Sequence, residues 1–106
     1  MNAVEEIQAA IENLTELKNG ASRAEWSAWR MYRPARGTFY GVEDGDVNEI
    51  AFTRTQQDAE LIEVLHRTID AQLTILSGEV NFCRVSGFSP ARNKVDLARA
   101  INGANS

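Results

Sequence analysis

The chain has 106 residues, of which 43% are hydrophobic and 25% are charged, and its formal net charge is −4. This length suits one hydrophobic core, and the composition is that of a folded protein, so we predict a single α+β domain over residues 1–106. The negative charge disfavours non-specific attraction to nucleic acid or anionic membrane. No apolar run approaches the roughly 20 residues that cross a bilayer, and the acidic N-terminus is unlike a signal peptide. We therefore expect a cytoplasmic protein without a membrane partner.

The first predicted element is an amphipathic helix over residues 2–18. Its apolar residues recur at gaps of three and four, which is the spacing of one helix face. Asn2 is a suitable N-cap residue, with Glu5 three positions later, and Gly20 is a typical C-terminal stop. The apolar face consists of Val4, Ile7, Ile11, Leu14 and Leu17.

Three short segments then predict a three-stranded antiparallel meander. The first runs from Trp26 to Tyr32 and ends before Pro34, which cannot donate a ladder hydrogen bond. The second covers residues 38–43, and the third covers residues 47–53. The Asp-Gly pair within residues 43–46 favours a tight turn between the second and third strands.

The most prominent pattern predicts a long amphipathic helix over residues 58–83, capped by Thr53 or Thr55. Ser77-Gly78 lowers helix propensity, so a bend is expected there. A short last helix is expected to start with Ser89 as its cap and Pro90 in its first turn, and to stop at residues 102–103.

The predicted packing places the helices over residues 2–18 and 58–83 side by side on one face of the sheet, since neither can bury its apolar stripe alone. The residues expected to fill the space between helices and sheet are Trp26 or Trp29, Ile50 and Phe52. Any apolar surface that remains on the long helix favours a homodimer, because closed two-fold dimers are the commonest oligomers.

The polar residues indicate neither a metal site nor a cofactor site. With one cysteine, Cys83, and one histidine, His66, the chain has too few ligands for a Cys/His zinc site. Phosphate-binding glycine motifs are lacking. His66 has Glu63 and Asp70 at helical spacing, which would suit acid–base chemistry in a small hydrolase. Because no partnered nucleophile accompanies it, the interpretation as a polar helix flank is favoured, and we predict a non-enzymatic protein.

The segment from Trp26 to Arg36 alternates aromatic and basic residues. Aromatic rings beside guanidinium groups are typical of surfaces that bind single-stranded nucleic acid. The alternative is that the tryptophans pack in the core while the arginines balance the acidic hairpin at Glu43, Asp44 and Asp46. The net negative charge favours this second interpretation. The candidate partner-binding residues are Trp29, Arg30, Tyr32, Arg33 and Arg36.

The stretches AIENLTELKNGASRAEW, QQDAELIEVLHRTIDAQLTIL and VDLARAING resemble small uncharacterised proteins of actinobacterial phages and prophages. A tryptophan followed downstream by Asp-Ala-x-Leu-Ile is more loosely similar to the Ead-type early phage proteins. The proteins that the chain resembles commonly have Gly-Pro where this chain has Ala24-Glu25. The resemblance implies an accessory protein that binds a host or phage protein in the host cytoplasm, and it brings no catalytic residues. The resulting order of hypotheses is protein-interaction module, single-stranded nucleic-acid binder, and hydrolase.

Overall fold

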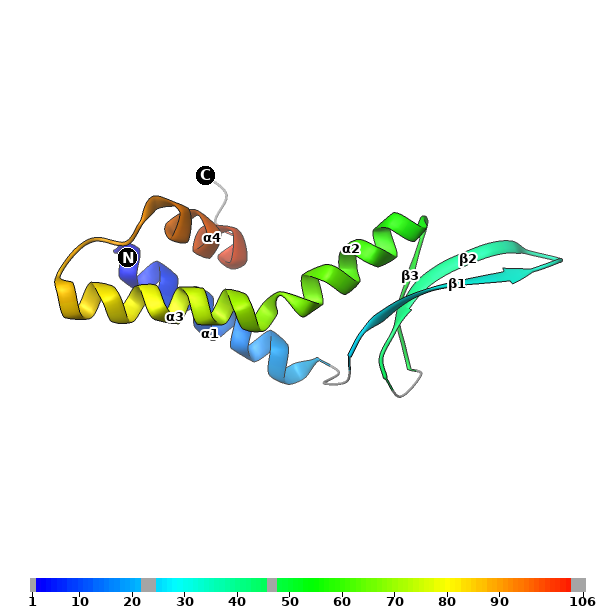
Figure 1. The fold of residues 1–106 in the computed structure, drawn as a ribbon, viewed down its shortest axis with the longest axis horizontal. Helices are drawn as coiled ribbons and strands as arrows, with labels where there is room; N and C mark the ends of the chain where they lie inside the picture. The colour runs from blue at the N-terminus through cyan, green and yellow to red at the C-terminus, as the bar shows by residue number, and fades with distance from the viewer. Residues whose placement is uncertain (1, 22–24, 46–47, 104–106) are drawn as a thin grey trace. The chain divides into compact units, whose positions relative to one another are not determined.

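The computed structural model describes residues 2–21, 25–45 and 48–103, and within them it confirms an α+β fold in the predicted order of helix, strands and helices (Figure 1). The contacts group into two compact units, which we describe separately. The helical unit comprises Met1–Ala21 and Ile69–Ser106, and the sheet unit comprises Ser22–Thr68. The single domain over residues 1–106 stays a prediction. The elements are α1 (Ala3–Gly20), β1 (Ser27–Arg33), β2 (Gly37–Glu43), β3 (Glu49–Thr53), α2 (Gln56–Arg67), α3 (Ile69–Ser86) and α4 (Arg92–Asn102).

The helical unit packs α1 against α3 and α4. The helix α1 begins as predicted, because the side-chain oxygen of Asn2 accepts a hydrogen bond from the backbone N–H of Glu5 at 2.8 Å. Its apolar stripe faces the other two helices, where gaps of three and four residues on each helix bring small and branched side chains together. The buried core consists of Ile7, Ala10, Leu76, Val80, Val95 and Ala98.

The last helix starts later than the sequence predicts. Ser89 is not its cap: the N-cap position is Ala91, which makes no side-chain cap hydrogen bond. The carbonyl of Ala91 accepts from the N–H groups of Lys94 and Val95 at 3.0 and 3.2 Å, so the helical hydrogen bonds begin there. The C-terminal stop is confirmed, since Gly103 adopts a left-handed conformation with φ 72°.

The predicted long helix over residues 58–83 is divided into α2 and α3 at Thr68. The hydroxyl of Thr68 donates to the carbonyl of Leu65 at 2.8 Å, and its N–H is shared between the carbonyls of Val64 and Leu65 at 3.2 Å each. A side-chain hydroxyl that bonds the preceding turn in this way competes with the regular helical pattern. The helix α3 runs through Gly78 without a break, so the interruption lies ten residues before the expected one.

The sheet unit has strand order β1-β2-β3, antiparallel throughout, as predicted. A three-residue turn, 34–36, joins β1 to β2, and the N–H of Arg36 donates to the carbonyl of Arg33 at 3.0 Å. Gly37 closes this turn with φ 80°, a conformation that favours glycine. The turn between β2 and β3 and the predicted start of the third strand include residues 46–47, which lie outside the described residues.

The helix α2 contacts all three strands, and Thr55 caps it by accepting from the N–H of Asp58 at 3.1 Å, as predicted. Val42 of the sheet and Ala59 of α2 are fully buried. The predicted side-by-side packing of α1 with the long helix is confirmed for the second part of that helix, α3. Two other parts of the predicted packing are wrong. The apolar face of α1 is taken up by α3 and α4, and Phe52 is not a core residue but is 65% exposed.

Candidate functional site on the open face of the sheet

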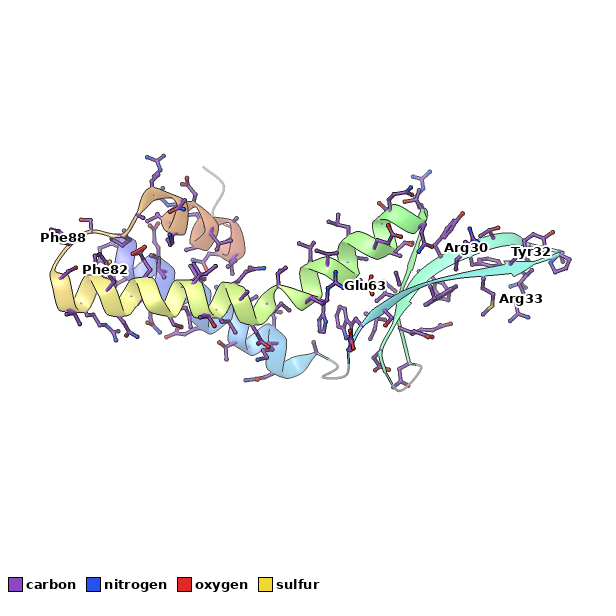
Figure 2. The ribbon with its side chains drawn as sticks, in the orientation of Figure 1. Arg30, Tyr32, Arg33, Glu63, Phe82 and Phe88 are labelled. Carbon is purple, nitrogen blue, oxygen red and sulfur yellow. The ribbon has the colours of Figure 1, made fainter. Side chains whose placement is uncertain are left out.

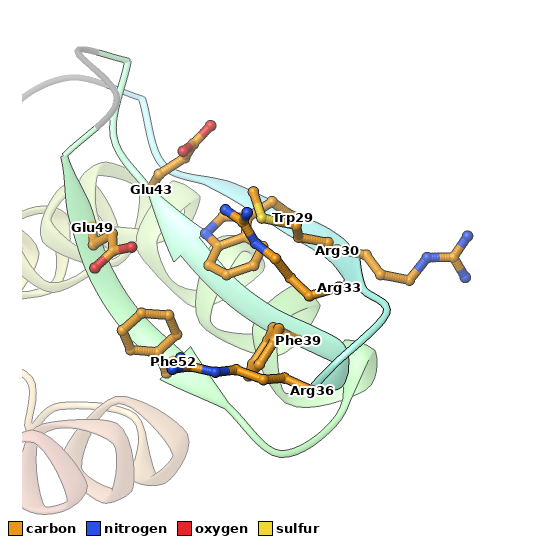
Figure 3. Close-up of a pocket in the computed structure, with 9 residues that line it drawn as sticks. Trp29, Arg30, Arg33, Arg36, Phe39, Glu43, Glu49 and Phe52 are labelled. Atoms are coloured by element: carbon orange, nitrogen blue, oxygen red, sulfur yellow. The ribbon is translucent and has the colours of Figure 1, made fainter.

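The two faces of the sheet differ in what covers them. Side chains alternate between faces along each strand, so Val42 points to the buried face while its neighbour Gly41 belongs to the opposite one. The helix α2 packs on the buried side, and within the described residues of this unit no helix covers the other side. We call this second surface the open face. Its apolar residues are Trp29, Met31, Phe39 and Phe52 (Figure 3).

A pair of aromatic rings occupies the centre of the open face. Trp29 stands opposite Gly41 on the neighbouring strand, and Gly41 stands opposite Phe52 on the next. A Cβ atom at position 41 would lie 2.5 Å from Trp29 Cζ2, so the indole rests on the glycine backbone. Its ring meets the Phe52 ring edge to face, with centroids 5.9 Å apart and planes at 86°. Glycine therefore lets the indole lie on the sheet and leaves Phe52 exposed beside it.

An irregularity in β3 places two glutamates on the same face. Val42 pairs with Ala51, whereas the next residue, Glu43, pairs with Glu49, so Ile50 is the extra residue of a bulge. In a regular strand, residues three apart such as Glu49 and Phe52 point to opposite faces, and the extra residue Ile50 brings them to the same face. Glu43 and Glu49 stand directly opposite each other, an arrangement of like charges that destabilises a sheet.

Two arginines lie at the other end of the open face. Arg33 ends β1 and Arg36 belongs to the following turn, and both side chains extend back over the sheet toward Trp29 and Phe52 (Figure 3). Within the described residues, neither arginine makes an ion pair. With the aromatic pair and the glutamates they line a shallow hollow of about 460 Å³. The arginine backbones and the glutamates thus lie at opposite ends of the open face, while the guanidinium groups reach back to the aromatic pair (Figure 3).

The structure brings together three of the five predicted site residues: Trp29, Arg33 and Arg36. Strand alternation sends the side chains of Arg30 and Tyr32 to the other side of β1, although the hollow extends to Arg30 (Figure 2). Tyr32 is 68% exposed. Trp29 is half-buried on the open face and is not part of the core. Arg33 and Arg36 line the same hollow as Glu43, so the interpretation in which they balance the acidic hairpin stays a prediction.

Sequence reasoning missed five residues of the site: Met31, Phe39, Glu43, Glu49 and Phe52. Strand alternation could have indicated three of them, because Met31 shares its parity with Trp29, and Phe39 and Glu43 share theirs with Gly41. Glu49 and Phe52 depend on the register of β3 against β2, and the bulge that sets this register leaves no mark in the sequence of β3 alone.

The residues proposed for acid–base chemistry are engaged in other contacts. The His66 ring stacks on Trp26, with centroids 3.9 Å apart and planes at 6°. Asp70 forms an ion pair with Lys18, and Glu63 makes no ion pair within the described residues. The ring contact of His66 and the ion pair of Asp70 are thus both made with residues outside the set Glu63, His66 and Asp70.

Cys83 is a buried residue of α3 with no disulfide partner. Burial raises the pKa of its thiol, and the nearby Glu79 carboxylate raises it further, so the thiol remains protonated and weakly nucleophilic near neutral pH. Among the described residues, no group of three or more His, Cys, Asp and Glu side chains is placed to hold a metal ion. None of the described helices combines the length and apolar character needed to span a membrane.

Comparisons of the chain with protein-family models, with curated proteins and with solved structures find no match. The function is therefore argued from the geometry of the open face.

Proposed function

We propose that this chain is a non-enzymatic protein-interaction module that binds a protein through the open face of its sheet. The observation that supports the proposal most is the exposure of apolar side chains around the indole of Trp29: Phe52 is 65% and Met31 is 45% exposed. Aromatic residues, methionine and arginine are the residue types enriched at the centres of protein interfaces, with polar groups at the rim. A contiguous apolar patch with a charged border is typical of such sites.

The partner that we propose is a host or phage protein met in the host cytoplasm. The support for this origin is the resemblance of the chain to small phage and prophage proteins, and it is independent of the open face. The proposal needs neither a cofactor nor a membrane, and it assigns no catalytic residue.

The test compares affinity capture from host lysate by the unaltered chain with capture by two variants. Phe52→Ser removes the exposed ring from the open face, and Phe82→Ser removes a ring of similar exposure, 53%, from α3. A central interface side chain contributes about 2 kcal/mol or more, equivalent to about 30-fold in affinity. We expect a retained protein to be lost with Phe52→Ser and kept with Phe82→Ser, each variant being folded by circular dichroism. Equal retention by all three chains would contradict the proposal.

A second candidate function is binding of single-stranded nucleic acid. The specific observation in its favour is that Arg33 and Arg36 lack ion-pair partners among the described residues and lie beside Trp29. Arginine and aromatic rings together attract phosphates and stack bases. Glu43 and Glu49 on the same face oppose a polyanion, which ranks this candidate second.

The nucleic-acid candidate is tested with labelled single-stranded oligonucleotides at low salt. It requires binding that weakens steeply as salt is added, and that weakens further with Arg33→Ala. Arg84→Ala in α3 is the matched control, because Arg84 is also exposed and makes no ion pair within the described residues. Binding that is indifferent to Arg33→Ala removes this candidate.

A further inference from the structure

The outer edge of β1 is open. The strand order is β1-β2-β3, so β1 pairs with β2 on one side, and within the described residues no strand pairs with its other side (Figure 1). In an antiparallel strand every second residue directs its N–H and C=O away from the neighbouring strand. The turn uses the carbonyl of Arg33, which accepts from the N–H of Arg36. The rest of the edge offers a row of backbone groups to a further strand.

The other edge of the sheet is less suited to a further strand. The strand β3 has five residues, and its pairing with β2 contains the bulge at Ile50. Short edge strands and bulges are features that prevent further pairing. The strand β1 has seven residues in continuous register with β2, from Ser27 opposite Glu43 to Arg33 opposite Gly37. A partner strand would therefore extend the sheet at β1.

The second half of β1 is exposed and positively charged on both faces. Arg30, Met31, Tyr32 and Arg33 are all exposed, although successive residues alternate between the faces. Arg30 extends away from the sheet on the side of β1 that faces away from β2, and Arg33 reaches back toward Trp29 on the open face (Figure 3). The strand contains two arginines and no acidic residue, and neither arginine makes an ion pair within the described residues. The edge thus presents one guanidinium on each face of the same stretch.

From the open edge and its charge we infer that the partner is held by strand addition: an extended segment with two adjacent acidic residues lies along β1 as a fourth strand. The inference rests on the proposed function, because it names the segment that holds the protein on the open face. Successive residues of a strand alternate between faces, so an acidic pair places one carboxylate beside Arg30 and the other beside Arg33. Apolar residues next to the pair would lie beside Met31 and Tyr32. The main-chain hydrogen bonds supply affinity, and the side chains select the partner.

Other occupants fit this edge less well. The β1 strand of a second copy would bring the same two arginines and no carboxylate, and like charges on neighbouring strands are destabilising. The acidic residues of the open face, Glu43 and Glu49, lie on β2 and β3 and do not border this edge. A nucleic acid could meet the arginines but has no peptide groups with which to continue the ladder. The backbone therefore favours a protein segment, and the charge favours an acidic one.

The experiment measures binding of labelled synthetic peptides by fluorescence anisotropy at low salt. The probe is Thr-Val-Thr-Glu-Glu-Val-Thr-Val, and the comparison peptide has Lys-Lys in place of Glu-Glu. We expect the unaltered chain to bind the acidic peptide at least about tenfold more tightly than the basic one, because two charge pairs change sign. The variant R30E/R33E should reverse this preference.

The matched control reverses two exposed arginines elsewhere. In R67E/R84E both altered side chains are exposed, lie in α2 and α3 and make no ion pair within the described residues. It should bind the acidic peptide like the unaltered chain. If R30E/R33E proves unfolded by circular dichroism, the neutral variant R30Q/R33Q replaces it and should weaken binding of the acidic peptide by a smaller factor.

A third peptide separates strand addition from attraction by charge alone. It has the sequence of the acidic probe, with methyl groups on its central backbone nitrogens. Methylation removes the donors of the ladder and keeps both carboxylates. We expect this peptide to lose at least about tenfold in affinity, because a strand at the edge depends on its main-chain hydrogen bonds.

Three outcomes overturn strand addition: no binding of the acidic probe, equal binding of the acidic and basic peptides, and equal binding of the methylated and unmethylated probes. The fate of the proposed function is decided separately. A chain that ignores the peptides but loses a captured protein through Phe52→Ser retains the interaction module, with the partner held by the open face alone. A chain that ignores the peptides but binds oligonucleotides through Arg33 supports the nucleic-acid candidate in its place.

Discussion

Several charged side chains of the helical unit form ion pairs with one another, whereas those of the open face form none within the described residues. Arg99 holds Glu6 through two hydrogen bonds of 3.3 and 3.2 Å, and Lys18 pairs with Asp70. On the open face, the arginines and glutamates make no ion pair within the described residues. These two ion pairs join helices to one another, while the charged side chains of the open face remain available to a ligand.

The apolar side chains differ between the two regions in the same way. Ile7 and Leu76 of the helical unit are fully buried, whereas the largest apolar side chains of the open face remain half-buried or exposed. The helical unit is not fully closed either, since Phe82 and Phe88 stack with centroids 6.1 Å apart and both are exposed (Figure 2). On the open face, exposed apolar side chains line one hollow together with charged side chains of both signs.

The largest effect that this comparison predicts is on stability. Ile7→Ala leaves a cavity among three packed helices and should lower the free energy of unfolding by about 2–5 kcal/mol. Phe52→Ala changes an exposed ring and should alter it by no more than about 0.5 kcal/mol. Chemical denaturation followed by circular dichroism at 222 nm measures both. If Phe52→Ala lowered the free energy of unfolding as much as Ile7→Ala, Phe52 would be needed for the fold. The contrast between buried apolar side chains in the helical unit and exposed ones on the open face would then be wrong.

A smaller effect is predicted for Gly41→Ala in the sheet unit. The added Cβ would lie 2.5 Å from both the Ala51 carbonyl oxygen and the Trp29 ring. Because the carbonyl belongs to the backbone, the strand must shift, and such overpacking should destabilise the sheet unit by about 1–3 kcal/mol. Both tryptophans, Trp26 and Trp29, belong to the sheet unit, so tryptophan fluorescence during denaturation reports on it.

Gly78→Ala is the matched control in the helical unit. No atom lies within 4 Å of the Cβ that would be added at this position of α3. Replacing glycine within a helix should stabilise it by about 1 kcal/mol. Destabilisation by both substitutions would show that the contact between Gly41 and the indole is not the cause.

Local signals in the sequence predicted much of the fold. Asn2 and Thr55 cap their helices through their own side chains, and Gly103 ends α4, because caps depend on residues within one turn. The break at Thr68 was missed because the apolar periodicity continues across it. The extra residue Ile50 was missed because a bulge is a property of two strands.

The difference between signals within one segment and pairing between two strands also explains which residues of the candidate site were predicted. Arg33 and Arg36 were predicted from their spacing in one segment, and the turn between them keeps them together. Glu49 and Phe52 join them only through the pairing of β3 with β2. A site assembled across strands requires the register, which single-sequence reasoning supplies least well.

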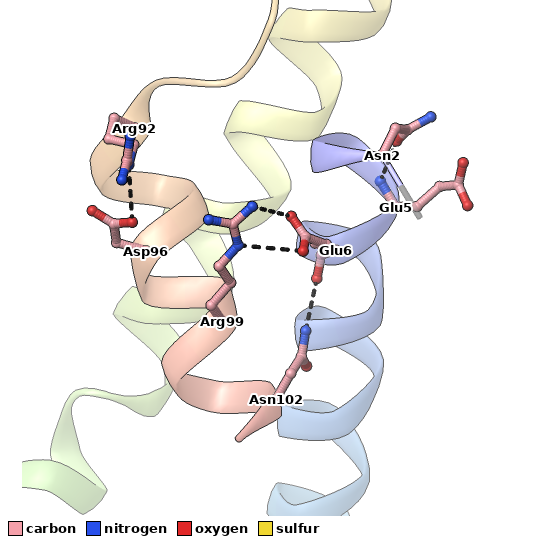
Figure 4. Close-up of polar contacts among 7 residues, drawn as sticks. All are labelled: Asn2, Glu5, Glu6, Arg92, Asp96, Arg99 and Asn102. Carbon is pink, nitrogen blue, oxygen red and sulfur yellow. Dashed lines mark hydrogen bonds and ion pairs between the residues drawn. The ribbon is translucent and has the colours of Figure 1, made fainter. Parts of the chain in front are cut away.

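The smallest predicted effect compares two arginines. Arg99 of α4 donates from both its Nε and one Nη to the two carboxylate oxygens of Glu6 in α1, beside the hydrogen bond from Asn102 to the Glu6 carbonyl (Figure 4). Because the pair is partly exposed, Arg99→Ala should cost about 1 kcal/mol of unfolding free energy, and less at high salt. Arg99→Lys should recover part of the lost unfolding free energy, since lysine keeps the positive charge but cannot make both hydrogen bonds to the Glu6 carboxylate at once.

Arg33→Ala should leave stability almost unchanged, because no ion pair is lost within the described residues. The two substitutions should be compared by denaturation at low and high salt, at concentrations low enough to keep the chain monomeric. An equal, salt-sensitive loss for Arg33→Ala would show that its charge stabilises the folded monomer. That charge would then be unavailable to an incoming acidic surface, and the contrast between the helical unit and the open face would no longer hold.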